Sequence, residues 1–416
     1  MGVILTLIVV LILTSSVIYV LSNNTEEPAE DNTNNDTDST DPKDDDKTDD
    51  GSDQTDDPID DNNPPPNTQN NFIFVEDASL VTCAPCVEAG MAIKEIYDEA
   101  SKDFYYVSMV SDKNDVAKQR LEEDLNLQVF PTVYIDGGYR VIKGSTNFEE
   151  VFNQALNDAG KRHKPNLYLN FTSFWDEDSK ELESNLYIEN YEEETYSGKL
   201  KIYITEKLSS RWSDAEGNPY HYAFLDYAEI KDIEVLSNSN ITFTSKWAST
   251  DAGFSDVYPQ NLYVIAVIFN SSSEQRYSLP DDNEAPFDAY FVDSVTATSV
   301  SEEGTLPPAV GISSPQIYHK YIFGNDRGKA DILLTTILIG KSTIELNIQA
   351  EAGVEKVEYK IENRRKQQTF TITEEPFELE LSMFSFGKIK ITATVYDNEG
   401  RTASDELELY AFMLGI

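Results

Sequence analysis

The chain contains two cysteines, and they stand close together as Cys83-Ala84-Pro85-Cys86. Two thiols at this spacing can form a disulfide within one helical turn. At the start of a helix, free backbone N–H groups and the positive end of the dipole favour a thiolate, so the pKa of Cys83 should fall below the ordinary thiol value of about 8.5. Cys83 would then attack a partner disulfide, and Cys86 would resolve the mixed disulfide. The pattern predicts thiol–disulfide exchange.

Two other interpretations of the cysteine pair stay open: the pair could form a permanent, inert disulfide, or it could be half of a metal site. A disulfide that closes so short a loop removes little chain entropy, so it would stabilise the fold only slightly. Zinc would need one or two further ligands, and the histidines of the chain, His163, His221 and His319, lie at or beyond the end of the region that carries the cysteines. We expect a redox-active pair with no metal and no cofactor.

Regular elements surround the cysteines and would position them. The pattern of apolar residues predicts strands and helices in the order strand, helix, strand, helix, strand, strand, helix, over residues 72–75, 83–100, 104–109, 115–125, 132–135, 139–142 and 148–159. Asp136-Gly137-Gly138 predicts the turn of the final hairpin. Parallel strands joined by helices and followed by a hairpin indicate an α/β sheet.

Residues 71–163 resemble the thioredoxin family. The resemblance rests on Cys83-Ala84-Pro85-Cys86 and on Val129-Phe130-Pro131-Thr132, about 45 residues later. It implies a thioredoxin fold, a cis Pro131 packed beside the dithiol, and substrate contacts by Phe130 and Thr82. Thr82 stands where the family usually has tryptophan, which removes the flat apolar surface on which substrates often rest.

The resemblance also implies a role for Asp77, six residues before Cys83. Thioredoxins hold a buried carboxylate near this place, and it moves a proton to and from the inner cysteine. Glu76 points to the opposite face of the same strand, so only one of the two can serve. A strand-end cap is the alternative role for Asp77. The strand at 104–111 offers no lysine to pair with it.

The remainder of the chain has the sequence pattern of β-structure. Beyond Pro165 the helical period disappears and short apolar runs alternate with polar turns, which predicts a β-sandwich over 164–304. Residues 305–416 resemble an immunoglobulin-like β-sandwich, on Pro308–Pro315, Val354–Tyr359 and Ile389–Gly400. That resemblance implies a spacer or a binding surface without chemistry.

The N-terminal part has a different composition. Residues 3–21 contain no charged side chain and are long enough to cross a bilayer, so we expect a transmembrane anchor over 1–22, with a cleaved signal peptide as the alternative. Residues 23–70 carry 17 acidic residues against 2 lysines and almost no apolar ones, which predicts a disordered acidic linker. An acidic tract that collects calcium is the alternative, although the spacing departs from a calcium loop.

The predicted architecture is therefore multidomain, an α/β thioredoxin fold followed by two all-β sandwich domains, with a transmembrane helix and a disordered linker before them. The formal net charge of −43 argues against nucleic acid as a partner, because phosphate binding needs clustered lysine and arginine. Asn-x-Ser/Thr sequons at Asn23, Asn35, Asn170, Asn240 and Asn270 agree with an extracytoplasmic chain.

The predicted function is that of a cell-surface thiol–disulfide oxidoreductase that acts on thiols or disulfides of exported proteins, contacts the membrane through its N-terminal helix and uses a redox partner that the sequence leaves unknown. A non-catalytic surface adhesion or scaffold protein with an inert head is the alternative.

Overall fold

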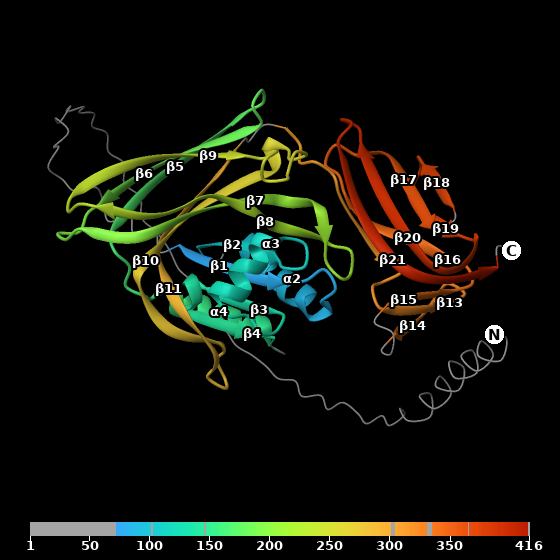
Figure 1. The fold of residues 1–416 in the computed structure, drawn as a ribbon, viewed down its shortest axis with the longest axis horizontal. Helices are drawn as coiled ribbons and strands as arrows, with labels where there is room; N and C mark the ends of the chain where they lie inside the picture. The colour runs from blue at the N-terminus through green and yellow to red at the C-terminus, as the bar shows by residue number, and fades with distance from the viewer. Residues whose placement is uncertain are drawn as a thin grey trace, which may run out of the picture. The chain divides into compact units, whose positions relative to one another are not determined.

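The computed structural model describes residues 72–100, 103–144, 147–300, 304–330, 335–364 and 366–414 (Figure 1). All of these residues belong to one compact unit. The expected anchor over 1–22 and the expected acidic linker over 23–70 lie outside the described residues.

The elements around the cysteines lie close to the expected ranges. They are β1 (Ile73–Ser79), α2 (Ala84–Asp98), β2 (Phe104–Val110), α3 (Asp115–Gln119), the π-helical turn η2 (Arg120–Asp124), β3 (Thr132–Ile135), the tight turn η3 (Asp136–Gly138), β4 (Arg140–Lys143) and α4 (Phe148–Gly160). Strand β1 pairs with β2 in parallel and with β3 antiparallel, and β3 pairs with β4 antiparallel across the expected hairpin.

These strands do not form a sheet of their own. They are four strands of an eight-stranded sheet with the order β11-β10-β7-β8-β2-β1-β3-β4. The other four are β7 (Tyr196–Ser213), β8 (Pro219–Val235), β10 (Leu262–Leu279) and β11 (Glu284–Ser299). The join is the parallel pairing of β2 with β8, at Ser108 and Ala223.

The expectation of an α/β thioredoxin fold followed by separate β-sandwiches is therefore wrong. Strands make up most of the described residues, and α-helices are limited there to α2, α3 and α4. The sheet that carries the cysteines continues into long antiparallel strands from residues 196–299. The physical reason is that the outer edge of β2 is paired with β8, so the sheet does not end at β2.

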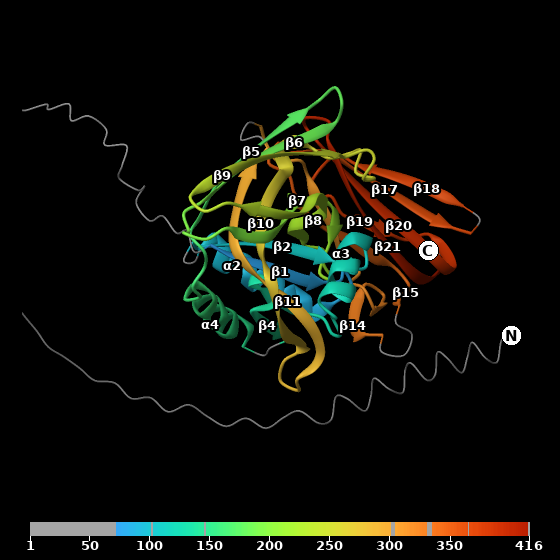
Figure 2. The same ribbon diagram turned by 60° about the vertical axis from the view of Figure 1, so that its left-hand side comes forward.

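The two faces of the β1–β4 part of the sheet are covered in different ways. On one face α2 and α4 pack through a core that includes Ile93 and Phe152. On the other face Phe74, Val107 and Met109 share a core with residues of β7, β8, β10 and β11. Figure 2 shows β11 crossing in front of β1 and β4. Both faces are thus buried, and strands supply much of the cover on the second face.

The turn between β3 and β4 packs closely against β11. Gly137 has φ 69°, and a Cβ atom on it would lie 2.1 Å from the carbonyl oxygen of Tyr290 in β11. Only glycine meets both demands, because it tolerates positive φ and leaves room for the approaching backbone. Asp136 beside it is fully buried and accepts from the backbone N–H of Phe74 at 3.0 Å.

A second layer lies against the long strands. The three-stranded sheet β5-β6-β9 consists of β5 (Leu167–Asp176), β6 (Glu181–Asn190) and β9 (Ser239–Ala248). Along β5 and β9 nearly every second side chain is exposed, as in a sheet with one solvated face, whereas along β6 buried side chains alternate with half-buried ones. The core between the layers includes Trp175, Trp247 and Leu186, together with apolar residues of β7, β8 and β10.

The C-terminal residues form two further sheets around one core. One has the order β12-β16-β19 and the other β14-β13-β15-β21-β20-β17-β18. The strands are β12 (Ala309–Ser314), β13 (His319–Ile322), β14 (Asn325–Lys329), β15 (Thr336–Ile339), β16 (Ser342–Gln349), β17 (Val354–Asn363), β18 (Gln367–Ile372), β19 (Leu379–Leu381), β20 (Phe384–Asp397) and β21 (Thr402–Leu414). The 3-10 turn η4 (Pro259–Asn261) precedes β10.

The membrane expectation also needs correction. In the part of the chain that the structure describes, no helix combines the length and the apolar character needed to cross a bilayer. The single-pass membrane localisation and the transmembrane helix predicted from the sequence are thus not supported by the described residues.

Candidate functional site

The cysteines lie at the start of α2 and are joined by a disulfide with a Cα–Cα distance of 5.3 Å. Cys83 is the N-cap residue, and its sulfur accepts a hydrogen bond from the backbone N–H of Cys86 at 3.2 Å. Cys83 is half-buried, whereas Cys86 is 3 % exposed. Pro85 stands in the first turn, where a missing N–H costs nothing. The outer sulfur is therefore the one within reach of a partner.

Asp77 lies beneath this helix. It is 2 % exposed, and its Oδ2 is 3.9 Å from where a Cβ on Gly90 would stand, one turn along α2 from Cys86. In the described residues its Oδ1 has no hydrogen-bond partner. Burial raises the pKa of Asp77 to about 7. A carboxyl group in this state can take up or release a proton near neutral pH, which is what an acid–base group beside a thiol requires.

Glu76 faces the other side of the sheet, as the alternation along β1 predicts. Its carboxylate accepts two hydrogen bonds from Arg120, at 3.0 and 2.9 Å, and one from the hydroxyl of Tyr203 at 3.2 Å. Glu76 is 1 % exposed and Arg120 is 9 % exposed, so this is a buried ion pair between β1 and η2. Asp77 is thus the carboxylate on the disulfide side.

The second sequence motif enters the sheet at the same end. Thr132 pairs with Ala78 at the end of β1, and the chain passes from β1 through Thr82 to Cys83. The Phe130–Pro131 peptide bond is cis, and the carbonyl of Pro131 accepts from the N–H of Gly144 at 3.0 Å. Phe130 and Thr82 are half-buried. The register places the start of β3 beside the end of β1 that leads into the disulfide.

Sequence reasoning missed the polar neighbours supplied by β2 and β8. Ser108 is the register partner of Asp77, and its hydroxyl donates to the carbonyl of His221 at 2.9 Å. Burial, and then the charge of Lys94 on α2, lower the pKa of His221 to about 4. The hydroxyl of Tyr106, also on the disulfide side of the sheet, is buried with no partner in the described residues. The signal available was the alternation of β2, which puts Tyr106 and Ser108 on the face of Asp77.

Besides the disulfide, a metal site and a cavity are the other places where chemistry can occur. Among the described residues, no group of three His, Cys, Asp or Glu side chains is placed to hold a metal ion. A cavity of about 1210 Å³ opens on the Arg120 side of the sheet, and the disulfide does not line it. The disulfide and this cavity are therefore two separate places in the described residues.

Taken together, the fold and the site define a mostly β protein that carries a Cys-x-x-Cys disulfide on a helix packed against a mixed sheet. No protein-family model matches the chain. No curated protein matches it either.

Solved structures give low similarity. A structural genomics target from Agrobacterium tumefaciens has a TM-score of 0.33 at 12 % identity and covers 56 % of this chain and 96 % of its own. The fibronectin(III)-like modules of Clostridium thermocellum CbhA have 0.20 at 11 % identity, over 59 % and 95 %. The alpha-2-macroglobulin of E. coli has 0.29 at 8 % identity, over 67 % of this chain and 17 % of its own.

At these TM-scores the likenesses carry no argument about fold or function. The thioredoxin-like and immunoglobulin-like resemblances seen in the sequence are not retained, because no family model matches the chain and the strands beside the cysteines belong to a larger, mostly β sheet.

Proposed function

We propose that the protein carries out thiol–disulfide exchange with protein partners through Cys83 and Cys86. The observation that carries the proposal is the disulfide at the N-terminus of α2, with Cys83 half-buried, Cys86 buried, and the carboxyl of Asp77 beneath the same helix. A structural disulfide needs no buried acid–base group beside it. An exchange site does, because a thiol must lose its proton before it attacks.

The exchange is a two-electron transfer in two displacements. In the reduced protein the thiolate of Cys83 attacks one sulfur of a partner disulfide, whose S–S bond breaks and leaves a partner thiolate. The thiolate of Cys86 then attacks the sulfur of Cys83, and the second partner thiolate leaves. Asp77 receives the proton that Cys86 loses. The partner is reduced, and the Cys83–Cys86 disulfide forms.

The N-terminus of α2 explains why Cys83 attacks first. Its sulfur accepts the backbone N–H of Cys86, and a thiolate accepts such a bond more strongly than a thiol does. The helix dipole adds to this stabilisation. Cys86 lies inside the first turn and is buried, so it reaches Cys83 more readily than it reaches a partner.

Trapping tests the proposal directly. A Cys86→Ser variant keeps the attacking sulfur and lacks the resolving one, so it should accumulate mixed disulfides when mixed with insulin or with an oxidised model protein. A Cys83→Ser variant is the matched control, because it keeps one thiol of the pair but removes the accessible one. Mixed disulfides are counted on non-reducing gels, and the wild type is assayed for insulin reduction.

The outcomes separate exchange from the non-catalytic alternative. Trapping by Cys86→Ser well above Cys83→Ser, together with turnover by the wild type, supports exchange. Equal trapping by the two variants and no insulin reduction would favour a scaffold or adhesion protein that carries an inert disulfide.

A further inference from the structure

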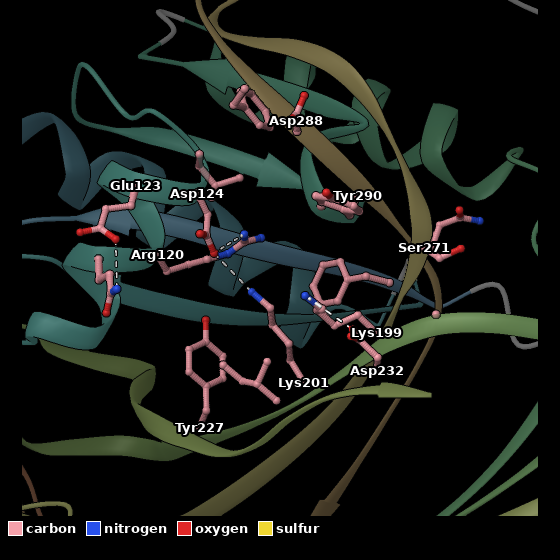
Figure 3. A pocket seen from close by; sticks show the side chains of 18 of the residues that line it. Arg120, Glu123, Asp124, Lys199, Lys201, Tyr227, Asp232, Ser271, Asp288 and Tyr290 are labelled. Carbon is pink, nitrogen blue, oxygen red and sulfur yellow. Dashed lines mark hydrogen bonds and ion pairs between the residues drawn. The ribbon is translucent and has the colours of Figure 1, made fainter. Parts of the chain in front are cut away.

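The cavity on the Arg120 side of the sheet contains a lysine that the exchange chemistry does not use (Figure 3). The cavity has a volume of about 1210 Å³, which is enough for a small organic molecule. Residues of η2, β7, β8, β10 and β11 line it. Lys201 of β7 reaches into it from a strand whose neighbouring residues, Leu200 and Ile202, are buried on the other face.

The amine of Lys201 is held by few and weak contacts. Its Nζ lies 3.4 Å from Oδ2 of Asp124, and this is its one hydrogen bond to a described residue. The rings of Tyr227 and Phe269 flank it, with centroids 5.5 and 5.6 Å from Nζ. The side chain is 10 % exposed. Two of the three N–H positions of the ammonium group are therefore left for a ligand or for water.

The floor of the cavity is balanced in charge. Arg120 is paired with Glu76 at 2.9 Å and with Asp124 at 3.1 Å, and Asp124 also faces Lys201. Figure 3 shows Lys201 and Arg120 converging on Asp124, and the hydroxyl of Tyr227 points toward the same place. Two positive and two negative groups alternate there, so the floor offers no net positive charge to attract an anion.

This setting weakens the protonated form of Lys201. Burial, and then the charge of Arg120, lower the pKa of Lys201 to about 8. Roughly one amine in ten is then neutral at pH 7, against fewer than one in a thousand for an ordinary lysine. A neutral lysine amine in a cavity, close to another cation, is the nucleophile that adds to carbonyl carbon.

The rim of the cavity selects against anions. Its exposed charged lining residues are carboxylates with the exception of Lys199, namely Glu122, Glu123, Asp124, Asp232, Glu234 and Asp288. Tyr290 and Phe287 also line the cavity and offer ring surface for an apolar body. Negative charge at the mouth repels negatively charged compounds, and the rings favour a flat apolar group.

We propose that Lys201 forms an imine with small neutral aldehydes or ketones, aromatic ones above all, that bind in this cavity. The neutral amine adds to the carbonyl carbon, a C–N bond forms, and the carbonyl electron pair moves to oxygen. The nitrogen passes one proton to Asp124, which returns it to the oxygen. Loss of water from the carbinolamine gives the C=N bond, so one carbonyl compound and one amine yield one imine and one water, with no oxidant or reductant.

Reductive trapping on the full chain tests the proposal. The protein is incubated with benzaldehyde and sodium cyanoborohydride between pH 6 and 9, and the benzylated lysines are mapped by peptide mass spectrometry. We expect Lys201 to be labelled at least about tenfold faster than Lys199, which lies two residues away, lines the same cavity and is more exposed. The rate at Lys201 should reach half its maximum near pH 8.

Two variants and a second aldehyde complete the test. Lys201→Arg keeps the positive charge but forms no imine, so the fast labelling should disappear. Lys231→Arg, at an exposed lysine of β8 outside the cavity lining, should leave it unchanged. The wild-type map stands even where Lys201→Arg fails to fold. 4-Carboxybenzaldehyde, which is negatively charged, should label Lys201 more slowly than benzaldehyde. Labelling spread over lysines in proportion to exposure overturns the reactive lysine, and faster labelling by the anionic aldehyde overturns the ligand class.

Discussion

At the scale of single residues, the most consequential feature is a carboxyl group held without a full set of partners under the helix that carries the disulfide. Asp77 is 2 % exposed, and within the described chain its Oδ1 accepts no hydrogen bond. Burying an ionised carboxylate in this way costs free energy, because water solvates it and the protein interior does not. The fold therefore bears this cost at the place where the proposed exchange would use an acid–base group.

This cost predicts a pH-dependent stability for Asp77→Asn. Burial raises the pKa of Asp77 to about 7 in the folded protein, against about 3.9 in an unfolded chain. Between these values the folded protein keeps a proton that the unfolded chain has lost, so the contribution of Asp77 to the free energy of unfolding falls as pH rises. Above pH 7 the loss amounts to roughly 4 kcal/mol. The variant removes the ionisation and should gain stability relative to the wild type as pH rises from 5 to 8.

Urea denaturation of the oxidised proteins at pH 5 and pH 8 measures this difference. An exposed aspartate on a turn, Asp178, is the control, because Asp178→Asn should change stability by less than about 0.5 kcal/mol at both pH values. A Asp77→Asn variant whose stability relative to the wild type is the same at both pH values would show that the carboxyl is not buried as described.

At the scale of elements, α3 is fastened to β8 by one side chain. Asn114 is 6 % exposed and is the N-cap of α3, where its Oδ1 accepts from the backbone N–H groups of Val116 and Ala117 at 2.9 and 3.1 Å. Its Nδ2 donates to the carbonyls of Phe224 and Leu225 at 2.9 and 2.8 Å. The residue therefore satisfies both ends of its amide between a helix and a strand that are more than 100 residues apart in sequence.

Substitutions at Asn114 separate the two roles. Asn114→Ala loses the cap, worth about 1 kcal/mol, and two buried hydrogen bonds, worth about 1 kcal/mol each, so we expect a loss of roughly 3 kcal/mol. Asn114→Asp keeps the cap but turns a carboxylate oxygen toward two carbonyls, so it should also be destabilised at pH 7. That variant should recover part of the loss at pH 4, where a protonated carboxyl can donate. Chemical denaturation measures all three proteins.

The matched control is Gln119→Ala, on the exposed side of the same helix, which should stay within about 0.5 kcal/mol of the wild type. If Asn114→Ala stayed within the same range, the contact between α3 and β8 would not be an anchor of the fold.

At the scale of the whole molecule, the strands and helices were predictable but their assembly was not. Periodicity within short windows located α2, β2, β3 and α4 to within a few residues, because such patterns are local. The pairing of Ser108 with Ala223 spans more than 100 residues, and nothing in the alternation of β2 states that its edge is taken by β8. In this stretch, the sequence pattern is the same for an α/β sheet with free edges and for an eight-stranded, mostly β sheet.

For the candidate site, too, the local features were predictable from the sequence and the long-range ones were not. Spacing alone located the disulfide and put Asp77 and Glu76 on opposite faces, and both follow from local geometry. Nothing in the local sequence pattern indicates that Arg120 pairs with Glu76 or that Lys201 is buried. Their burial depends on β10 and β11, which cover that face from residues 262–299.

The shared sheet gives a test of the corrected architecture. A fragment of residues 71–163 would expose the edge of β2 and the face that holds Phe74, Val107 and Met109, which the intact protein buries against the later strands. An open strand edge and a bare apolar face favour association over folding. We expect this fragment to aggregate or to melt without cooperativity, whereas a fragment of residues 71–304, which keeps all eight strands, should unfold in one cooperative transition.

Circular dichroism melts and size-exclusion chromatography of the two fragments, each with its disulfide intact, make the comparison. The intact chain gives the reference melting temperature. A monomeric 71–163 fragment with a sharp transition would mean that helices α2 and α4 and four strands suffice for a stable fold, and that the later strands merely cover a domain that is already complete. Failure of 71–163 beside success of 71–304 would place the folding unit, and with it the support of the disulfide, in the whole eight-stranded sheet.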